Sequence, residues 1–272
     1  MKRWKRWFLI MVFLGILLVS TPLALSPQPI DIILTPEPVN LELPLLPDFA
    51  DHLPEIPPST PITTPPPEFQ GKIVYKVDLP PTEKAIALTF DDGPWQNSDR
   101  FLEVLDTHQI KATFFVVGKH LELYPQVAQR LVEKGHIIAN HSWNHTYQPL
   151  SATQAATEVK KTENEILRLT GVKTTLFRPP GGVLDNGMVT QAKSQNYTII
   201  MWSVDPQDYT NIQASTITQR VVSQAKSGGI ILLHDGGGSR RQTLEALPQI
   251  ISQFKQQGYE FVTIPELLAK SL

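Results

Sequence analysis

The sequence contains no cysteine among its 272 residues. This absence excludes a disulfide framework, thiolate metal sites and cysteine nucleophiles together, and it leaves the chain indifferent to an oxidising compartment. Neither sign of charge is in excess, since 24 Lys and Arg residues stand against 26 Asp and Glu residues. A nucleic-acid-binding protein needs a basic surface to offset phosphate charge, so no nucleic-acid partner is expected. The length suits one core of ordinary size with appendages, not two large domains.

Long apolar runs are scarce, and the clearest one spans Trp7 to about Leu25. Four cations precede it: Lys2, Arg3, Lys5 and Arg6. A basic flank ahead of an apolar run keeps the N-terminus in the cytoplasm and sends the following residues across a membrane. Residues 1–26 are therefore predicted to be a signal anchor or a signal peptide. We expect an anchor, because the small-residue site ending at Ser26 is followed by Pro27, although the apolar run is short for a span.

The stretch from 27 to 70 is rich in proline and poor in basic residues. Thirteen prolines lie between Pro27 and Pro67, together with six acidic residues and neither lysine, arginine nor glycine. Proline at this density removes the donors that helices and sheets need and favours extended, polyproline-like segments. Residues 27–70 are therefore predicted to be a disordered linker that holds residues 71–272 away from the membrane, with protein docking as the alternative.

From Gly71 onwards, short β-branched runs alternate with amphipathic patterns, which is typical of an α/β fold. Strands are predicted at Ala85–Phe90, Ala112–Val117, Ile137–Asn140, Thr175–Arg178, Thr198–Val204, Gly229–His234 and Glu260–Thr263. Helices are predicted at Ser98–His108, Leu121–Lys134, Ala152–Leu169, Asn186–Ser194, Thr216–Ser227, Arg241–Gln257 and Ile264–Lys270. Parallel strands would either close into a barrel or stay an open sheet. In both cases reactive side chains gather at the carboxyl ends of the strands.

Two adjacent carboxylates, Asp91 and Asp92, directly follow the first predicted strand. Adjacent carboxylates repel each other unless a cation or an arginine offsets one of them, and a metal supplies such an offset. Because neighbouring residues project in different directions, one carboxylate can bind the metal while the other stays free as a base. The alternative interpretation is a plain Asp-Gly turn.

Two histidines, His141 and His145, follow the third predicted strand in the segment HSWNH. A spacing of four places both imidazoles on one face of a helical turn, where they can hold the same ion. With Asp92 they complete a set of two nitrogens and one oxygen that leaves a coordination position open for water, as in catalytic sites. A pair of surface histidines is the alternative. No role is assigned to the histidines without such a context, which are His52, His108, His120 and His136.

Three further strand ends carry polar residues. Arg178 closes the fourth strand, where it can hydrogen-bond Asp91 and hold it ionised, while the Pro and Gly turn that follows brings backbone N–H groups near a bound carbonyl. The segment DPQDY at 205–209 follows the strand that contains Trp202, and His234 ends the next strand. A histidine paired with an aspartate of the neighbouring loop can be kept protonated as a general acid. A satisfied core histidine is the alternative.

The ordered segments TFDDGP at 89–94, HSWNH at 141–145, RPPGG at 178–182, DPQDY at 205–209 and LLH at 232–234 resemble the five motifs of the NodB-homology polysaccharide deacetylases, carbohydrate esterase family 4. The resemblance runs from about Val74 to Leu268. It implies a distorted (β/α) barrel with fewer than eight repeats and removal of an acetyl group from a sugar polymer. It also implies a divalent metal, usually Zn²⁺, with Co²⁺ or another divalent ion as the alternative.

The resemblance also assigns roles residue by residue. Asp91 is similar to the catalytic base and Arg178 to the residue that orients it, while His234 resembles the acid and Asp208 its partner. The metal ligands would be Asp92, His141 and His145. Gly181, Trp202 and Tyr209 would contact the oxyanion or the substrate.

Two positions depart from the family pattern. Gly181 stands where the third motif usually has an aromatic residue, so its backbone N–H can still serve the oxyanion but an apolar wall is lost. Tyr209 stands where the fourth motif usually has tryptophan. Both departures bear on substrate fit more than on the reaction.

The expected function is a metal-dependent hydrolase that removes N-acetyl groups from N-acetylglucosamine-containing cell-wall glycan. Peptidoglycan is preferred because the predicted anchor and linker place the site on the extracytoplasmic side of a bacterial membrane, or outside the cell if the segment is cleaved. The expected partners are this glycan and the membrane, and no protein partner is implied. The alternatives are hydrolysis of O-acetyl xylan, another ester or a small amide on the same scaffold, and a non-catalytic glycan-binding envelope protein.

Overall fold

A computed structural model of the chain describes residues 65–271. The predicted anchor at 1–26 and most of the predicted linker lie outside these residues. The last linker residues lie within them, where Pro67–Phe69 form a short 3-10 helix, η2, whose Phe69 packs against the core. Within residues 65–271, every helix is too short or too polar to cross a membrane.

One parallel sheet organises the described residues. Its strands are β1 (Ile73–Val74), β2 (Ala85–Gly93), β3 (Thr113–Val116), β4 (Ile137–Asn140), β5 (Leu176–Phe177), β6 (Thr198–Ile200), β7 (Ile230–His234) and β8 (Glu260–Phe261). They lie in the order β1-β6-β5-β4-β3-β2-β7, and β8 pairs with β2. Beyond the end of β6, Val204 forms a parallel bridge with Ile231 of β7. The sheet therefore curls into a half-barrel whose far strands approach each other.

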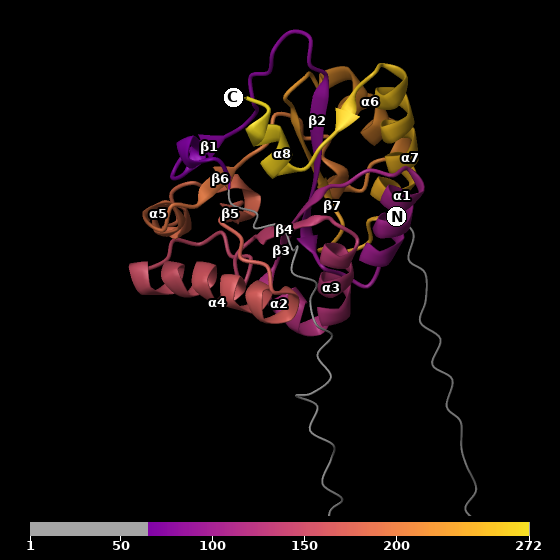
Figure 1. The fold of residues 1–272 in the computed structure, drawn as a ribbon. Helices are drawn as coiled ribbons and strands as arrows, with labels where there is room; N and C mark the ends of the chain where they lie inside the picture. The colour runs from indigo at the N-terminus through magenta and orange to yellow at the C-terminus, as the bar shows by residue number, and fades with distance from the viewer. Residues whose placement is uncertain (1–64, 272) are drawn as a thin grey trace, which may run out of the picture. The chain divides into compact units, whose positions relative to one another are not determined.

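Helices follow the strands, and all of them except the last lie around the outside of the sheet (Figure 1). They are α1 (Ser98–Thr107), α2 (Gly118–Leu123), α3 (Pro125–Glu133), α4 (Ala152–Thr170), α5 (Met188–Ser194), α6 (Ala214–Gln224), α7 (Arg241–Gln256) and α8 (Ile264–Ala269). Two further 3-10 helices are η3 (Pro180–Gly182) and η4 (Asp208–Thr210). The alternation of strands and helices along the chain is the one that the sequence predicts.

The longest helix, α4, has defined signals at both ends. The Ser151 hydroxyl accepts a hydrogen bond from the Gln154 N–H, and the Gln154 side chain accepts one from the Ser151 N–H, which is a capping box. Gly171 ends the helix in the left-handed conformation, which glycine adopts without a steric penalty. The caps place the buried face of α4, which includes Glu158, against the sheet.

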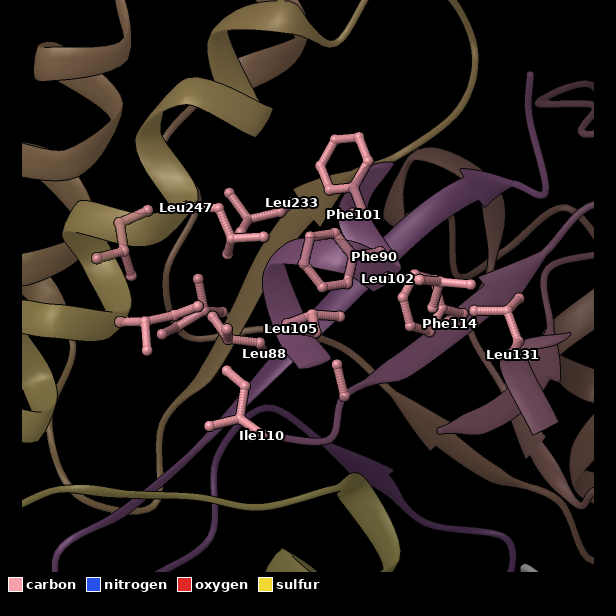
Figure 2. Close-up of a cluster of buried hydrophobic side chains, with 14 of the residues drawn as sticks. Leu88, Phe90, Phe101, Leu102, Leu105, Ile110, Phe114, Leu131, Leu233 and Leu247 are labelled. Atoms are coloured by element: carbon pink, nitrogen blue, oxygen red, sulfur yellow. The ribbon is translucent and has the colours of Figure 1, made fainter. Parts of the chain in front are cut away.

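The two faces of β2 enter two different hydrophobic clusters. Ile86, Leu88 and Phe90 pack outward against helices such as α1 and α7, through Phe101 and Leu247 (Figure 2). The alternate residues Ala85 and Ala87 face inward, where Ile264, Leu267 and Leu268 of α8 fill the interior of the half-barrel. Because side chains alternate along a strand, the residues that follow in the inward series are Thr89 and Asp91.

Several predicted boundaries are wrong. The helix predicted at Leu121–Lys134 is interrupted at Tyr124, which has φ −132° and ψ 52°, because the proline ring of Pro125 disfavours helical geometry in the residue before it. The strand predicted at Thr198–Val204 ends at Ile200. The short strand β1 and the 3-10 helix η4 lie in segments for which neither was predicted.

Candidate active site

A pocket of about 620 Å³ opens at the carboxyl ends of the strands. Its lining includes nearly all the residues singled out in the sequence, and comprises Asp91, Asp92, His120, His141, Asn144, His145, Tyr147, Gly181, Trp202, Asp205, Tyr209, Leu232, His234, Gly237 and Arg240. Another hollow of about 570 Å³ lies between α6 and α7, and only one of its lining residues, Glu245, has a titratable side chain. The first pocket is therefore the candidate active site.

Asp91 lies at the end of β2 and is almost fully buried. Arg178, which is completely buried, donates from Nη1 to Asp91 Oδ1 at 2.7 Å and to Thr89 Oγ1 at 2.8 Å. Its Nε and Nη2 donate to the carbonyl oxygens of Ile200 and Met201, both at 3.0 Å. Arg178 thus spans the interior of the half-barrel and fixes one oxygen of Asp91 through a charge-assisted hydrogen bond, a contact that the sequence predicts.

His234 lies beside Asp91 because the two residues are register partners in the parallel pair of β2 and β7. Asp208, on η4, accepts a hydrogen bond from the His234 backbone N–H at 2.9 Å and lies 2.7 Å from His234 Nδ1. The Thr243 hydroxyl of α7 also donates to Asp208, at 2.9 Å. Burial opposes protonation of His234, but the hydrogen bond and charge of Asp208 outweigh it, so the pKa of this imidazole is raised. The structure therefore pairs His234 with Asp208, the partner that the resemblance assigns, and not with Asp205.

Asp92, His141 and His145 each bring one ligand atom within 4.8 Å of the others. His145 Nε2 lies 2.9 Å from Asp92 Oδ1, and His141 Nε2 lies 3.6 Å from the same oxygen. That oxygen is buried and accepts no hydrogen bond within residues 65–271. Burial opposes ionisation of Asp92, but the two imidazoles outweigh it and hold the pKa of this carboxyl well below its usual range.

The residues of this cluster fit a divalent cation. His141 Nδ1 lies 2.7 Å from the Arg178 carbonyl oxygen, so Nδ1 carries the proton and Nε2 presents its lone pair to the cluster. Two imidazole nitrogens and one carboxylate oxygen thus converge without hydrogen-bonding one another. Two nitrogens and one oxygen are the ligand composition of catalytic zinc sites. The cluster predicted from the sequence is brought together by the fold.

The prediction that a helical turn carries the two histidines is wrong. Residues 141–145 form a loop in which Ser142 and His145 have φ values of 67° and 56°. The carboxylate of Glu158 on α4 holds this loop by accepting from the backbone N–H groups of Trp143 at 2.9 Å and Asn144 at 2.7 Å. Because α4 and not a local helix orients the imidazoles, their geometry depends on a contact between distant parts of the chain.

Some residues of the site lie outside the sequence motifs that predict it. His120, to which no role was assigned, lines the pocket, and its Nδ1 lies 2.8 Å from the Asp92 carbonyl oxygen. Arg240 lies with Nη2 at 4.0 Å from Asp92 Oδ2, so each of the two adjacent carboxylates faces an arginine. Asp235 is completely buried, and burial raises its pKa to about 7. Its carboxylate leaves no room for a side chain at Gly93, where a Cβ would lie 2.5 Å away.

The three residues predicted to contact the oxyanion or the substrate all line this pocket. Tyr209 is 44% exposed and lies edge-on to His234, with ring centroids 5.3 Å apart. The Arg178 guanidinium carbon lies over the Trp202 ring, 5.7 Å from the centroid of that ring. Gly181 lies in η3 with φ 58°.

The half-barrel places a carboxylate and a histidine beside a two-histidine, one-carboxylate cluster, and these are the groups that metal-dependent hydrolysis uses. The family described as polysaccharide deacetylase matches residues 78–200. A Bacillus cereus peptidoglycan-N-acetylglucosamine deacetylase is 40% identical in a 212-residue alignment that covers 74% of this chain and 95% of that protein. The chain therefore belongs to the polysaccharide deacetylases, carbohydrate esterase family 4, which are hydrolases of carbon–nitrogen bonds.

Other similar proteins agree with this membership. The peptidoglycan-N-acetylmuramic acid deacetylase PdaC of Bacillus subtilis is 36% identical over 189 residues, which are 69% of this chain and 39% of that protein. The crystal structure of the Bc1960 peptidoglycan N-acetylglucosamine deacetylase superposes with a TM-score of 0.69 at 33% identity, covering 74% of this chain and 94% of that one. Both the sequence relationship and the fold extend over most of the described residues.

Proposed function

We propose that this protein removes N-acetyl groups from N-acetylglucosamine units of cell-wall glycan, with peptidoglycan as the preferred polymer. The observation that carries the proposal is the placement of Asp91 and His234 side by side on β2 and β7, next to the cluster of Asp92, His141 and His145. The names of the relatives, which are peptidoglycan deacetylases, support the choice of polymer.

In the proposed mechanism Asp91 is the base. It takes a proton from the water that attacks the acetyl carbonyl carbon, and Arg178 orients it for this step. A divalent cation held by Asp92, His141 and His145 would polarise the carbonyl and acidify water, and zinc fits this ligand set. The backbone N–H of Gly181 would stabilise the oxyanion, an effect worth roughly 3 kcal/mol for one well-placed donor.

His234 is the proposed acid. It donates a proton to the amide nitrogen as the carbon–nitrogen bond breaks, and acetate and a free amino sugar leave. Asp208 raises the pKa of this imidazole against the effect of burial, which favours the protonated form that the leaving nitrogen needs. Trp202 and Tyr209 would form the walls against which the sugar and its acetyl group lie.

We further propose that residues 1–26 anchor the chain in a membrane and that residues 27–70 are a proline-rich linker, whose last residues form η2. The basic flank, the apolar run and the thirteen prolines of the sequence support this proposal. In this arrangement residues 71–272, a distorted barrel with fewer than eight repeats, act at the extracytoplasmic face of a bacterial envelope. The position would bring the pocket to peptidoglycan.

The test is acetate release by the purified full chain from N-acetylglucosamine oligomers and from peptidoglycan. Each substrate is assayed with the protein as purified, after chelation and after zinc is restored. We expect release that chelation abolishes and zinc restores, with peptidoglycan preferred. Release from acetylated xylan or small acetyl esters but not from either glycan would contradict the proposed substrate, and an absence of release from all of them would contradict the proposed activity.

A further inference from the structure

Asp92 has a backbone conformation that a regular strand does not contain. Its φ is 69°, in the left-handed region, and the pairing of β2 with β3 shifts register here, so that Asp91 pairs with Phe115 and Gly93 with Val116. Asp92 is therefore the extra residue of a β-bulge, with no register partner among the described strands. A residue other than glycine adopts the left-handed conformation at a cost, so contacts with the rest of the fold must hold it there.

The bulge decides where the Asp92 carboxylate points. Side chains alternate along a regular strand, so Asp92 would follow Leu88 and Phe90 onto the outward face of β2, which packs against helices. A bulge changes the direction of the side chain that it carries. In the structure the carboxylate lies in the pocket instead, with Oδ1 2.9 Å from His145 Nε2. The three-residue cluster therefore depends on the left-handed conformation of one residue.

His120 holds the backbone of this bulge. Its Nδ1 lies 2.8 Å from the Asp92 carbonyl oxygen, and because a carbonyl oxygen only accepts, Nδ1 carries the proton and donates. The imidazole is placed in turn by Trp95, whose ring lies edge-on to it with centroids 4.8 Å apart. In the loop after β7, Gly236 packs so close to the same carbonyl oxygen that a Cβ would lie 1.9 Å from it. His120 and Gly236 thus confine the Asp92 peptide.

The helix that carries His120 also holds the loop of the two histidine ligands. α2 begins directly after β3. The Gly118 N–H donates to the Ser142 carbonyl oxygen at 2.9 Å. The Lys119 N–H donates to the Trp143 carbonyl oxygen at 3.1 Å, and both acceptors lie between the two histidines of the cluster in the sequence. The first turn of α2 therefore contacts both segments that supply the cluster, and His120 is its contact with the bulge.

We propose that His120 is a positioning residue of the metal site. Its Nδ1–H keeps the Asp92 peptide in the left-handed conformation and so directs the carboxylate to His141 and His145. The inference rests on the proposed function, in which this cluster holds a divalent cation. His120 acts through Asp92, and neither a proton transfer nor a contact with the substrate is part of its role.

The experiment compares His120→Phe and His120→Asn with the unmodified full chain. The dissociation constant for Zn²⁺ is measured by competition with a chromophoric chelator. Phenylalanine keeps a ring against Trp95 but has no donor, whereas asparagine loses the ring but has a donor, Nδ2, at the same branch position as Nδ1 of histidine. His120→Phe should weaken zinc binding about 10- to 100-fold, which is the usual loss for a residue that supports a metal ligand. His120→Asn should leave the affinity unchanged.

Two results would overturn the inference. An unchanged affinity in His120→Phe would show that Asp92 is directed to the cluster without this donor. An equal loss in both variants would show that the ring and not the hydrogen bond matters. His108→Phe, outside the pocket, is the control and should bind zinc as the unmodified chain does. If the unmodified chain itself binds no zinc, the proposed metal-dependent function is overturned instead.

A second measurement tests the hydrogen bond in the unmodified chain, so it stands even if His120→Phe does not fold. Heteronuclear NMR of the histidine ring nitrogens distinguishes a protonated nitrogen from an unprotonated one, and it is recorded after chelation at alkaline pH, where imidazoles are neutral. The signals of His120 are those that disappear in His120→Asn. Nδ1 should be protonated and Nε2 unprotonated, and a proton on Nε2 in place of Nδ1 would overturn the inference.

Discussion

Asp91 on β2 and His234 on β7 are register partners in a parallel strand pair. The backbone hydrogen bond from the Asp235 N–H to the Asp91 carbonyl oxygen, at 3.2 Å, continues this pairing beyond the end of β7. The proposed base and the proposed acid are therefore held by the sheet and not by flexible loops. Sites built on strands keep the separation of two groups more constant than sites built on loops.

Asp91→Asn should abolish deacetylation while metal content stays unchanged. A positioned general base contributes about 10² to 10⁴ in rate, so the loss should be at least of that order. Metal content, measured by elemental analysis, should stay the same because the cluster consists of Asp92, His141 and His145. Retained turnover in Asp91→Asn would remove this residue from the role of base.

His145→Ala should lower the affinity for zinc, because it removes one of the two imidazole nitrogens of the cluster. We expect a loss of roughly 100-fold or more, since even residues that only support metal ligands cost 10- to 100-fold when they are replaced. Titration calorimetry with zinc gives the affinity directly, and His141→Ala should behave alike. His108→Ala, outside the pocket, is the control, and an unchanged affinity in the two cluster variants would exclude the proposed ligand set.

Asp208→Asn should move the alkaline limb of the rate profile to lower pH. His234 must be protonated to act as an acid, so activity falls as the pH rises through its pKa, and the Asp208 charge raises that pKa. Loss of the Asp208 charge lowers the pKa of His234, and the alkaline limb of the profile moves to lower pH with it. Profiles of kcat/KM against pH measure the shift. Asp205→Asn should leave the limb in place, and equal shifts in the two variants would contradict the pairing of His234 with Asp208.

Arg178→Met should strongly destabilise the fold, because it leaves the buried Asp91 carboxylate without its ion-pair partner. Removal of one member of a buried pair costs about 3–5 kcal/mol in the free energy of unfolding. Adding Asp91→Asn to Arg178→Met should recover part of this loss, since the uncompensated charge is then gone. Urea unfolding of the unmodified chain and of these two variants measures the changes. The exposed pair of Arg241 and Glu245 is the comparison, for which Arg241→Ala should cost less than about 1 kcal/mol.

Asp235→Asn should stabilise the protein more at pH 8 than at pH 5. Burial raises the pKa of this carboxyl from 3.8 to about 7, so the folded state favours the protonated form. Its contribution to stability is complete below about pH 4 and is lost, at up to about 1.4 kcal/mol per pH unit, as the pH rises to 7. Asparagine stays neutral and avoids this loss.

The measurement for Asp235→Asn is thermal unfolding across this pH range, after chelation of metal. The exposed residue Asp185 supplies the control, because Asp185→Asn should change the melting temperature equally at every pH. A difference between Asp235→Asn and the unmodified chain that does not grow with pH would show that Asp235 is already ionised in the folded state.

The sequence alone determined the α/β class, the ends of most helices and strands, and the residue types at the carboxyl ends of the strands. These features depend on local patterns. The alternation along β2 places Ala85, Ala87 and Asp91 on one face, and the capping signals of Ser151 and Gly171 bound α4. Because parallel strands end at the same edge of the sheet, the reactive residues could be expected to meet there.

Tertiary structure decided how those residues meet. Glu158 of α4 shapes the loop that carries His141 and His145. The position of η4 beside β7 brings Asp208 against His234, and the Tyr147 ring fills the space beside Gly181. Each is a contact between segments that are distant in the chain. A local pattern fixes which face of a strand or helix a residue occupies, but it carries no information on which distant side chain fills the space opposite, because register and packing across the whole core determine that choice.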